Sequence, residues 1–279
     1  MEYVNFTLEI RDNVAILKLN RPDKANALTN NALVEIAHAL ESVQNNEEVC
    51  SVLLYGEGKH FCSGNDLQDK RFSKDGKARN YLVRWEDYEI RHASEMKIYH
   101  YPKPTVVAVH GLCLGAGFEL AALGDFMIAS EDATFGLPEM RMSIVPLSRL
   151  VYAFNQMRFA KEAIMTGENF GADRAYQMGL VNKVVPQEKL LDEAMVLARK
   201  LALMPPETMK VAKQVCNKVN RIQGFDLIAE ESKIYTIHSL ELPTKMREQF
   251  NAIGAEQGLG AAFKWQKEYF AQANKPFAE

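Results

Sequence analysis

The sequence is poor in cysteine and lacks any long hydrophobic run, and these two absences exclude several classes of protein. Its 279 residues include four cysteines, at positions 50, 62, 113 and 216, and none of them forms a C-x-x-C pair. Scattered thiols of this kind are typical of small buried side chains in a reducing compartment. No basic and apolar leader and no run of about 18 apolar residues is present. We therefore expect a cytoplasmic protein with no membrane partner.

Neither sign of charge dominates the chain. It has 33 Lys and Arg against 36 Asp and Glu, which gives a net charge of −3. This balance offers no basic face to nucleic acid, so we expect no nucleic-acid partner. The six histidines show no H-E-x-x-H or other metal-ligand spacing, and no G-x-S-x-G turn occurs. We therefore expect neither a metal site nor a serine nucleophile.

The chain is, by contrast, rich in hydrophobic residues, which make up 47% of it. FTLEIRDNVAILKLN (6–20) alternates as a hairpin does, and Thr29 can cap a following helix. SVLLYGEG (51–58) has the pattern of a strand, and YLVRWEDYEIRHASEMKIY (81–99) that of a charged helix. Strand, turn and helix patterns recur in this way along most of the chain. They predict an α/β protein with crossover connections.

The pattern changes at about Pro205, after which only helical spacing is found. We therefore divide the chain into a core, residues 1–204, and a C-terminal helical region, residues 205–279. The second part is too small for a strong core of its own, so it should pack on the first or on neighbouring subunits.

Two glycine-containing turns follow predicted strands, FCSGNDL (61–67) and LGAGFEL (114–120). Gly115 and Gly117 match the first two glycines of a dinucleotide-binding fingerprint, but Leu120 stands in place of the third. Small residues also let a ligand approach peptide N–H groups, and a helix N-terminus adds partial positive charge. Brought together, the two turns would form a two-donor oxyanion hole. The alternative is that the glycines only allow tight packing of strand against helix.

Two glutamates lie in small or apolar surroundings: Glu119 in the second turn and Glu139 in ATFGLPEM (133–140). Burial would raise the pKa values of both carboxyl groups. A pair of carboxyl groups facing one pocket can act as base and acid. Alternatively, Glu119 is a favourable first-turn helix carboxylate and Glu139 a surface residue. The spacing does not choose between these readings.

Together these stretches resemble the motifs of the crotonase, or enoyl-CoA hydratase/isomerase, superfamily. The resemblance also rests on LNRPDKANAL (19–28), on AVHGLCLGAGFELAALGD (108–125), on MTGENFGADRAYQMGLVNKVVP (165–186) and on QGLGAAFKW (257–265), in the family's order. It implies a spiral of ββα units with a helical C-terminal region that assembles as a homotrimer or a dimer of trimers. It also implies an acyl-CoA thioester as substrate and no cofactor, since CoA is part of the substrate.

The same resemblance implies a role for each residue of the site. The backbone N–H groups of Asn65 and Ala116 would hold the thioester oxygen. Glu119 would deprotonate a water that attacks C3 of a 2-enoyl-CoA, and Glu139 would give a proton to C2. This is the reaction of an enoyl-CoA hydratase, a carbon–oxygen lyase of fatty acid metabolism. Further substrate contacts are implied for Lys24, Ala25, Ser63, Gly64, Asp66 and Gly115.

Several alternatives stay open. An isomerase, hydratase-lyase, hydrolase or decarboxylase could use the same oxyanion hole, and a non-catalytic acyl-CoA-binding subunit could keep the fold. RMSIVPLSRLVYAF (141–154) departs from the glycine-rich segment usual in the family, where it borders the acyl pocket, so the acyl group is undetermined. Arg149 fits a polar acyl contact or solvent, and Lys24 and Lys275 fit the CoA phosphates or solvent. The polar stretch from Leu67 to Asn80 is expected to be a mobile loop.

Overall fold

The computed structural model describes residues 3–67 and 80–274, apart from the side chains at 148, 149 and 274. Most of the expected loop between Leu67 and Asn80 lies outside the described residues, as do Lys275 and the side chain of Arg149. Within the described chain, strands and helices alternate before a helical C-terminal region. The predicted α/β class is therefore confirmed.

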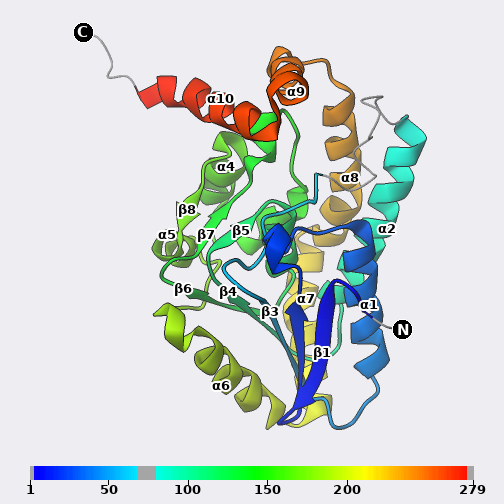
Figure 1. Cartoon of the computed structure of the whole chain (residues 1–279). Helices are drawn as coiled ribbons and strands as arrows, with labels where there is room; N and C mark the ends of the chain where they lie inside the picture. Colours follow the sequence, from blue (N-terminus) through cyan, green and yellow to red (C-terminus); the bar gives the residue numbers. More distant parts are fainter. Residues whose placement is uncertain (1–2, 68–79, 275–279) are drawn as a thin grey trace.

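A six-stranded sheet forms one layer of the described chain (Figure 1). Its strands, in spatial order, are β1 (Phe6–Arg11), β2 (Val14–Leu19), β3 (Ser51–Gly56), β4 (Thr105–Val109), β6 (Phe126–Ser130) and β9 (Lys183–Val185). β1 and β2 form the predicted antiparallel hairpin, and the other neighbours pair in parallel. Asp12 and Asn13 at the hairpin turn have φ of 53° and 59°, as two-residue turns of this kind require.

A smaller sheet carries both candidate site segments. It consists of β5 (Leu112–Leu114), β7 (Thr134–Gly136) and β8 (Phe170–Gly171), with β5 and β7 parallel and β7 and β8 antiparallel. Leu114 pairs with Gly136, so the chain leaves both parallel strands at the same edge of the sheet. The helix α3 (Ala116–Ala121) and the 3-10 helix η2 (Pro138–Met142) begin just beyond that edge. Sheet topology therefore brings Glu119 and Glu139 to one place.

Helices cover both faces of the large sheet (Figure 1). α6 (Leu190–Ala202) packs on one face, and α1 (Asn30–Val43) and α2 (Tyr81–Tyr99) contribute to the core on the other. Successive residues of a strand point to opposite faces, and accordingly Ala15 and Leu17 belong to one core and Val14 and Ile16 to the other. The Thr29 side chain accepts from the N–H of Ala32, which confirms the predicted helix cap.

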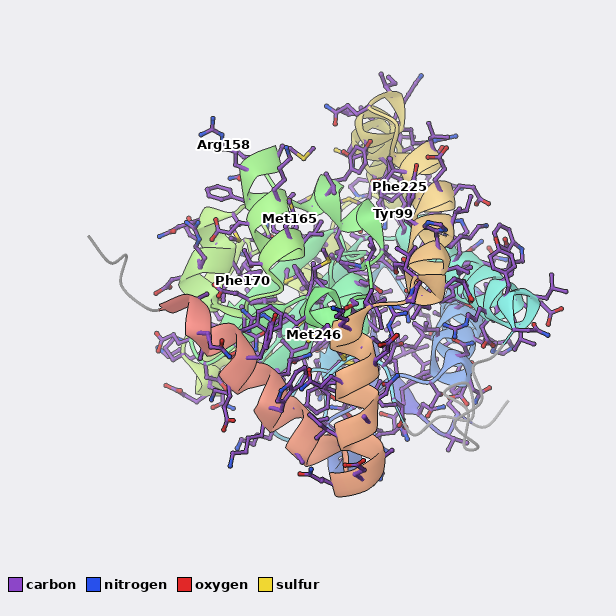
Figure 2. The ribbon with its side chains drawn as sticks, turned by 90° about the horizontal axis from the view of Figure 1, so that it is seen from above. Tyr99, Arg158, Met165, Phe170, Phe225 and Met246 are labelled. Atoms are coloured by element: carbon purple, nitrogen blue, oxygen red, sulfur yellow. The ribbon has the colours of Figure 1, made fainter. Side chains whose placement is uncertain are left out.

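The chain after Met204 is helical, as the sequence pattern predicted. Its main helices are α7 (Pro206–Ile222), α8 (Phe225–Glu241), α9 (Lys245–Gln257) and α10 (Leu259–Ala271). α8 packs against α2, where the rings of Phe225 and Tyr99 stack with centroids 4.3 Å apart (Figure 2). The division into a core and a separate C-terminal region stays a prediction. None of the described helices combines the length and the apolar character needed to cross a lipid bilayer.

Shorter helices complete the described chain. They are α4 (Met157–Thr166), α5 (Ala172–Gln177) and the 3-10 helices η1 (Pro22–Lys24), η3 (Ser148–Ala153), η4 (Gln187–Lys189) and η5 (Gln272–Asn274). η3 lies within the segment 141–154, which follows Glu139 in the chain.

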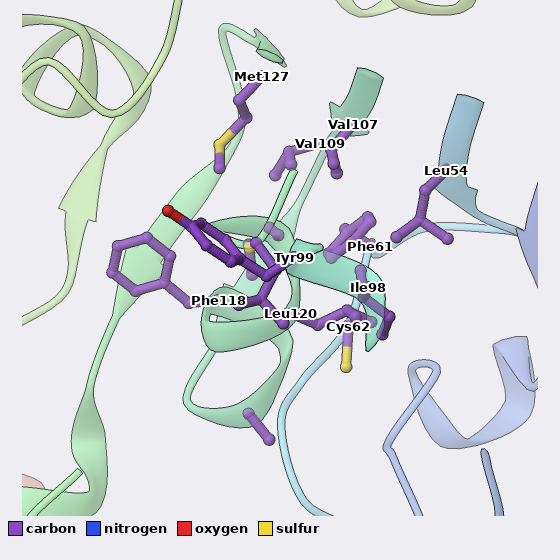
Figure 3. Packing of buried hydrophobic residues seen from close by; sticks show 14 of the residues in the cluster. Leu54, Phe61, Cys62, Ile98, Tyr99, Val107, Val109, Phe118, Leu120 and Met127 are labelled. Carbon is purple, nitrogen blue, oxygen red and sulfur yellow. The ribbon is translucent and has the colours of Figure 1, made fainter. Parts of the chain in front are cut away.

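The main hydrophobic core lies around α3 and the first glycine turn (Figure 3). Phe118 and Leu120 from α3 are fully buried, as are Phe61 and Cys62 from the turn. Each large apolar side chain buried in this way contributes roughly 1.5–3 kcal/mol to the stability of the folded state. Glu119 lies between two anchored residues of α3, so its position is set by the core.

Candidate active site

The two glycine turns lie directly against each other. The N–H of Cys62 donates to the carbonyl oxygen of Leu112, and the N–H of Leu114 donates back to that of Cys62, at 2.9 and 3.0 Å. A Cβ atom at Gly117 would lie 2.7 Å from Sγ of Cys62, closer than real contacts allow. One at Gly64, where φ is +104°, would lie 3.0 Å from the carbonyl oxygen of Leu114. These glycines are explained by contact between the turns, without any nucleotide.

Among the backbone N–H groups at this junction, those of Asn65 and Ala116 have no acceptor within the chain that the structure describes. Gly64 and Asp66 both bond to Leu28, so the N–H of Asn65, between them, points to the other side. Ala116 is fully buried and opens α3, whose first N–H groups have no intrahelical acceptor. A buried donor such as the N–H of Ala116 calls for a partner. Together the two donors are suited to bind a negatively charged oxygen.

The structure brings Glu119 and Glu139 close enough for the charge of one carboxyl group to act on the other. The N–H of Glu119 donates to the carbonyl oxygen of Gly115 at 2.9 Å. A Cβ atom at position 115 would lie only 2.1 Å from Oε1 of Glu139. The carboxyl group of Glu139 therefore occupies the space that a side chain at 115 would fill. Glu119 is 4% exposed, so it is not a surface helix residue.

The carboxyl group of Glu139 is strongly perturbed. Burial, and then the neighbouring charge of Glu119, raise its pKa to about 8. Its Oε2 atom is buried and has no hydrogen-bond partner among the residues in the described ranges. At neutral pH this group mostly keeps its proton. It can therefore serve as an acid.

The structure adds Arg91 from α2, which the sequence reasoning missed. Its guanidinium, 4% exposed, bonds through Nη2 to Oε2 of Glu119 and through Nη1 to Oδ1 of Asn65, the latter at 2.7 Å. Its Nε lies 3.1 Å from the carboxylate of Glu95, also buried. Burial lowers the pKa of Arg91, but the two carboxylates outweigh this and raise it above the ordinary value. The only sequence signal was the i,i+4 spacing of Arg91 and Glu95, which exposed helices share.

The segment 141–154 reaches the site through its backbone. The N–H of Leu147 donates to Oε1 of Glu119 at 3.0 Å, so both oxygens of that carboxylate are held by donors. α8 fixes the segment, because the hydroxyl of Ser239 accepts from the N–H of Val145 at 3.0 Å. The altered segment thus lies beside Glu119.

The N-terminal motif packs against the first turn and gathers most of the residues predicted to contact substrate. The N–H of Ser63 donates to the carbonyl oxygen of Ala25 at 3.0 Å, next to Lys24. The carboxylate of Asp66 pairs with the guanidinium of Arg21 at 2.8 Å, a contact that the sequence did not reveal. The following predicted substrate contacts therefore lie in one region: Lys24, Ala25, Ser63, Gly64 and Asp66. Their contact with CoA stays a prediction.

A cavity of about 550 Å³ reaches Glu119 from the side of α7 and α8. Apolar side chains that line it include those of Leu123, Met127, Leu150 and Leu180. Leu150 belongs to the segment 141–154, as do Tyr152 and Ala153, which also line the cavity. Among the described residues, no three His, Cys, Asp or Glu side chains gather as metal ligands would.

Comparison with known proteins gives concordant matches. The family model described as enoyl-CoA hydratase/isomerase matches residues 9–246. The chain is 33% identical over 243 residues to the short-chain-enoyl-CoA hydratase of Clostridium acetobutylicum, covering 84% of this chain and 89% of the relative. It is 31% identical over 228 residues to the 2,3-dehydroadipyl-CoA hydratase of Escherichia coli K12, covering 80% and 86%.

A solved structure extends the match to almost the whole chain. It is that of an enoyl-CoA hydratase/isomerase from Xanthobacter autotrophicus Py2, with a TM-score of 0.89 and 30% identity. The match covers 99% of this chain and 100% of that one. The predicted crotonase-like architecture is confirmed.

Proposed function

Since the chain belongs to the enoyl-CoA hydratase/isomerase family, we propose that it is an enoyl-CoA hydratase that adds water across the double bond of a 2-enoyl-CoA thioester. The observation that carries the proposal is the pair of neighbouring glutamates beside the N–H groups of Asn65 and Ala116, for which the described residues offer no acceptor. The relatives from C. acetobutylicum and E. coli, which are named short-chain-enoyl-CoA hydratase and 2,3-dehydroadipyl-CoA hydratase, support it.

The thioester oxygen is placed between the N–H groups of Asn65 and Ala116. Negative charge develops on this oxygen as the enolate forms, so the two donors bind the transition state more strongly than the substrate. Removal of one such donor in enzymes of this general type costs about 3 kcal/mol of barrier. The side chains at 65 and 116 need not react.

The two glutamates divide the proton transfers. Glu119 takes a proton from water as the water oxygen bonds to C3, and the electrons of the double bond move into the thioester enolate. Glu139, which holds a proton at neutral pH because its pKa is raised to about 8, delivers it to C2. Exchange with solvent returns the proton from Glu119 to Glu139. Since the two carboxyl groups lie close enough for the charge of Glu119 to raise the pKa of Glu139, both are expected to act on one face of the double bond, which makes the addition syn.

The remaining predicted contacts form the rest of the proposed binding site. The CoA moiety is assigned to the N-terminal motif and first turn, at Lys24, Ala25, Ser63, Gly64 and Asp66, and the thioester to the surroundings of Gly115. The acyl group is assigned to the cavity that reaches Glu119, whose volume of about 550 Å³ suits a short or functionalised chain. We further propose that the protein acts in the cytoplasm as a homotrimer or a dimer of trimers.

An exposed apolar stripe on α7 supports assembly. Val211, Val215, Val219 and Ile222 recur at helical spacing and are all more than half exposed. Such a stripe is typical of a surface that another subunit covers.

A single assay tests the proposed reaction. The purified protein is incubated with 2-enoyl-CoA thioesters of different chain length and polarity, and the products are weighed by mass spectrometry. Hydration adds the mass of one water to the intact thioester. Shortened acyl chains would instead indicate a hydratase-lyase, and released CoA a hydrolase. Absence of turnover on the whole panel would favour a non-catalytic acyl-CoA-binding subunit.

A further inference from the structure

Arg91 joins the two halves of the candidate site. One edge of its guanidinium reaches the carboxylate of Glu119, and another reaches the side chain of Asn65. Glu119 is the proposed base, and the backbone N–H of Asn65 is one of the two proposed oxyanion donors. These residues come from different turns, so Arg91 is a side-chain link between them in addition to the backbone contacts.

The surroundings of Arg91 do not suit it as an anchor for an anionic substrate. Its Nε faces Glu95 at 3.1 Å, and its other two nitrogens are occupied by Glu119 and Asn65. The two carboxylates more than balance its single positive charge. The guanidinium is also 4% exposed, so an incoming anion would have to displace a buried partner.

We propose, on the basis of the proposed hydratase function, that Arg91 is a positioning residue that fixes the base Glu119 relative to the oxyanion donor Asn65. The planar fork of an arginine suits this role because it holds two partners in fixed directions, which a lysine cannot do. A displacement of about 1 Å between reacting groups can cost roughly 100-fold in rate. A residue that touches neither water nor thioester can therefore control turnover.

Glu95 completes the arrangement. When Glu119 accepts a proton from water it becomes neutral, and Arg91 loses one of its two anionic partners. The carboxylate of Glu95, fully buried at 3.1 Å, still balances the guanidinium during that interval. A buried arginine without any carboxylate would be costly. Glu95 thus lets the base be neutralised without leaving an unpaired buried charge.

The titratable groups that interact with Glu119 or with its partner Arg91 come from three segments. They are Tyr88, Arg91 and Glu95 on α2, Glu139 on η2 and Cys62 in the first turn. Among these, Arg91 is the cation in contact with Glu119. Its removal favours the protonated, inactive form of the base. The acidic limb of the kcat/KM profile should therefore move to higher pH.

The test uses Arg91→Gln and Arg91→Lys in the full chain, with Arg84→Gln as the matched control. Arg84 lies on the same helix but pairs with Glu241 of α8 at 3.3 Å. With a 2-enoyl-CoA that the wild type hydrates, R91Q should lose roughly 100-fold in kcat with KM within about threefold. R91K should recover part of the loss, because it restores a charge but not the fork. R84Q should keep the wild-type kcat and pH profile.

A spectroscopic measurement reports on the oxyanion hole without turnover. Bound 3-phenylpropenoyl-CoA absorbs at longer wavelength when donors polarise its thioester carbonyl. R91Q should show a smaller red shift than the wild type, because Asn65 is no longer held, and R84Q should show the full shift. Circular dichroism and size-exclusion chromatography check that each variant is folded and assembled.

The outcomes separate the two hypotheses. If the wild type hydrates no 2-enoyl-CoA, the proposed function fails, whatever the variants do. If the wild type is active and folded R91Q keeps its kcat, its acidic limb and its red shift, the role of Arg91 alone is overturned. Should R91Q not fold, R91K decides: wild-type kcat and pH profile in R91K would equally overturn the role.

Discussion

Glu119 and Glu139 are the same residue type beside the same glycine, yet their surroundings are opposite. Glu119 receives one donor at each carboxylate oxygen, from Arg91 and from the backbone of Leu147. Glu139 has a buried Oε2 atom that finds no donor within the described part of the chain, and its pKa is raised to about 8. Donors favour the charged form of a carboxyl group and burial favours the neutral form. Two identical side chains can therefore supply a base and an acid.

Replacement of either glutamate should cause the largest loss of activity. In the proposed mechanism Glu119→Gln removes the base and Glu139→Gln the acid, and each should lower kcat by roughly 100-fold to 10,000-fold. KM should change little, because neither group is assigned to CoA. Steady-state rates with a hydrated 2-enoyl-CoA and calorimetric binding of the thioester measure the two effects. Full turnover in either variant would contradict the assigned roles.

Gly115→Ala tests whether the space beside the carboxyl group of Glu139 matters. Its Cβ atom would lie 2.1 Å from Oε1 of Glu139, and φ of +49° is unfavourable for alanine. Displacement of the acid should lower kcat by roughly 100-fold, and the backbone strain should cost about 1–2 kcal/mol of stability. Gly260→Ala is the control, because a Cβ there meets nothing within 4 Å. Equal rates and equal thermal stability in the two variants would rule out the space requirement.

The pH dependence sharpens the contrast between the two carboxyl groups. Since the pKa of Glu139 is about 8 in the folded protein, the acid loses its proton above that pH. There kcat/KM should fall by roughly tenfold per pH unit. Rate profiles measured above and below this pH check the expectation. A rate that stays level well above it would exclude Glu139 as the acid.

The stability of the folded protein should also fall as pH rises. An ordinary glutamate has a pKa of 4.5, so between 4.5 and about 8 the folded state binds more protons at Glu139 than the unfolded chain does. The contribution of Glu139 to stability therefore falls as pH rises through this window. The fall should be weaker in E139Q, which thermal unfolding at several pH values can show. Parallel curves for the two proteins would contradict a raised pKa.

The smallest expected effect concerns the 550 Å³ cavity. The two glutamates differ here as well, because Glu119 lines this cavity and Glu139 does not. Ala153 lines the same cavity, and Ala153→Leu would fill part of it. The value of kcat/KM for longer acyl groups should fall by roughly tenfold, while the shortest 2-enoyl-CoA serves as the internal control. Competition between two thioesters in one mixture measures the ratio. An unchanged ratio would place the acyl group elsewhere.

The sequence could predict the structural features that depend on residues close together in the chain. The hairpin at Asp12 and Asn13, the cap at Thr29 and the helix over 81–99 follow from local turn, capping and periodicity rules, and the structure confirms each of them. The glycine turns and both glutamates were found as motifs. That the two glutamates lie close together follows from the pairing of β5 with β7, which no local pattern reveals.

Arg91 and Leu147 could not be predicted for the same reason. Arg91 stands in a charged helix, where no local pattern marks a buried side chain, and its burial depends on how α2 packs against distant elements such as α1 and α8. Leu147 acts through its backbone N–H, so its residue type carries no signal. Asp66 was assigned to substrate binding from the resemblance, and its pairing with Arg21 shows that it also ties the N-terminal motif to the first turn.

The parallel register of β5 and β7 also bears on how such a chain can evolve. Leu114 of β5 pairs with Gly136 of β7. Glu119 lies five residues after Leu114, and Glu139 lies three residues after Gly136. An insertion or deletion within either short interval would move one carboxyl group and leave the other in place. The segment after Met142 is held at a few backbone points, such as Leu147 and Val145, and it can change composition between them. Under the proposed function, substrate preference can therefore change through this segment while the two carboxyl groups stay in register.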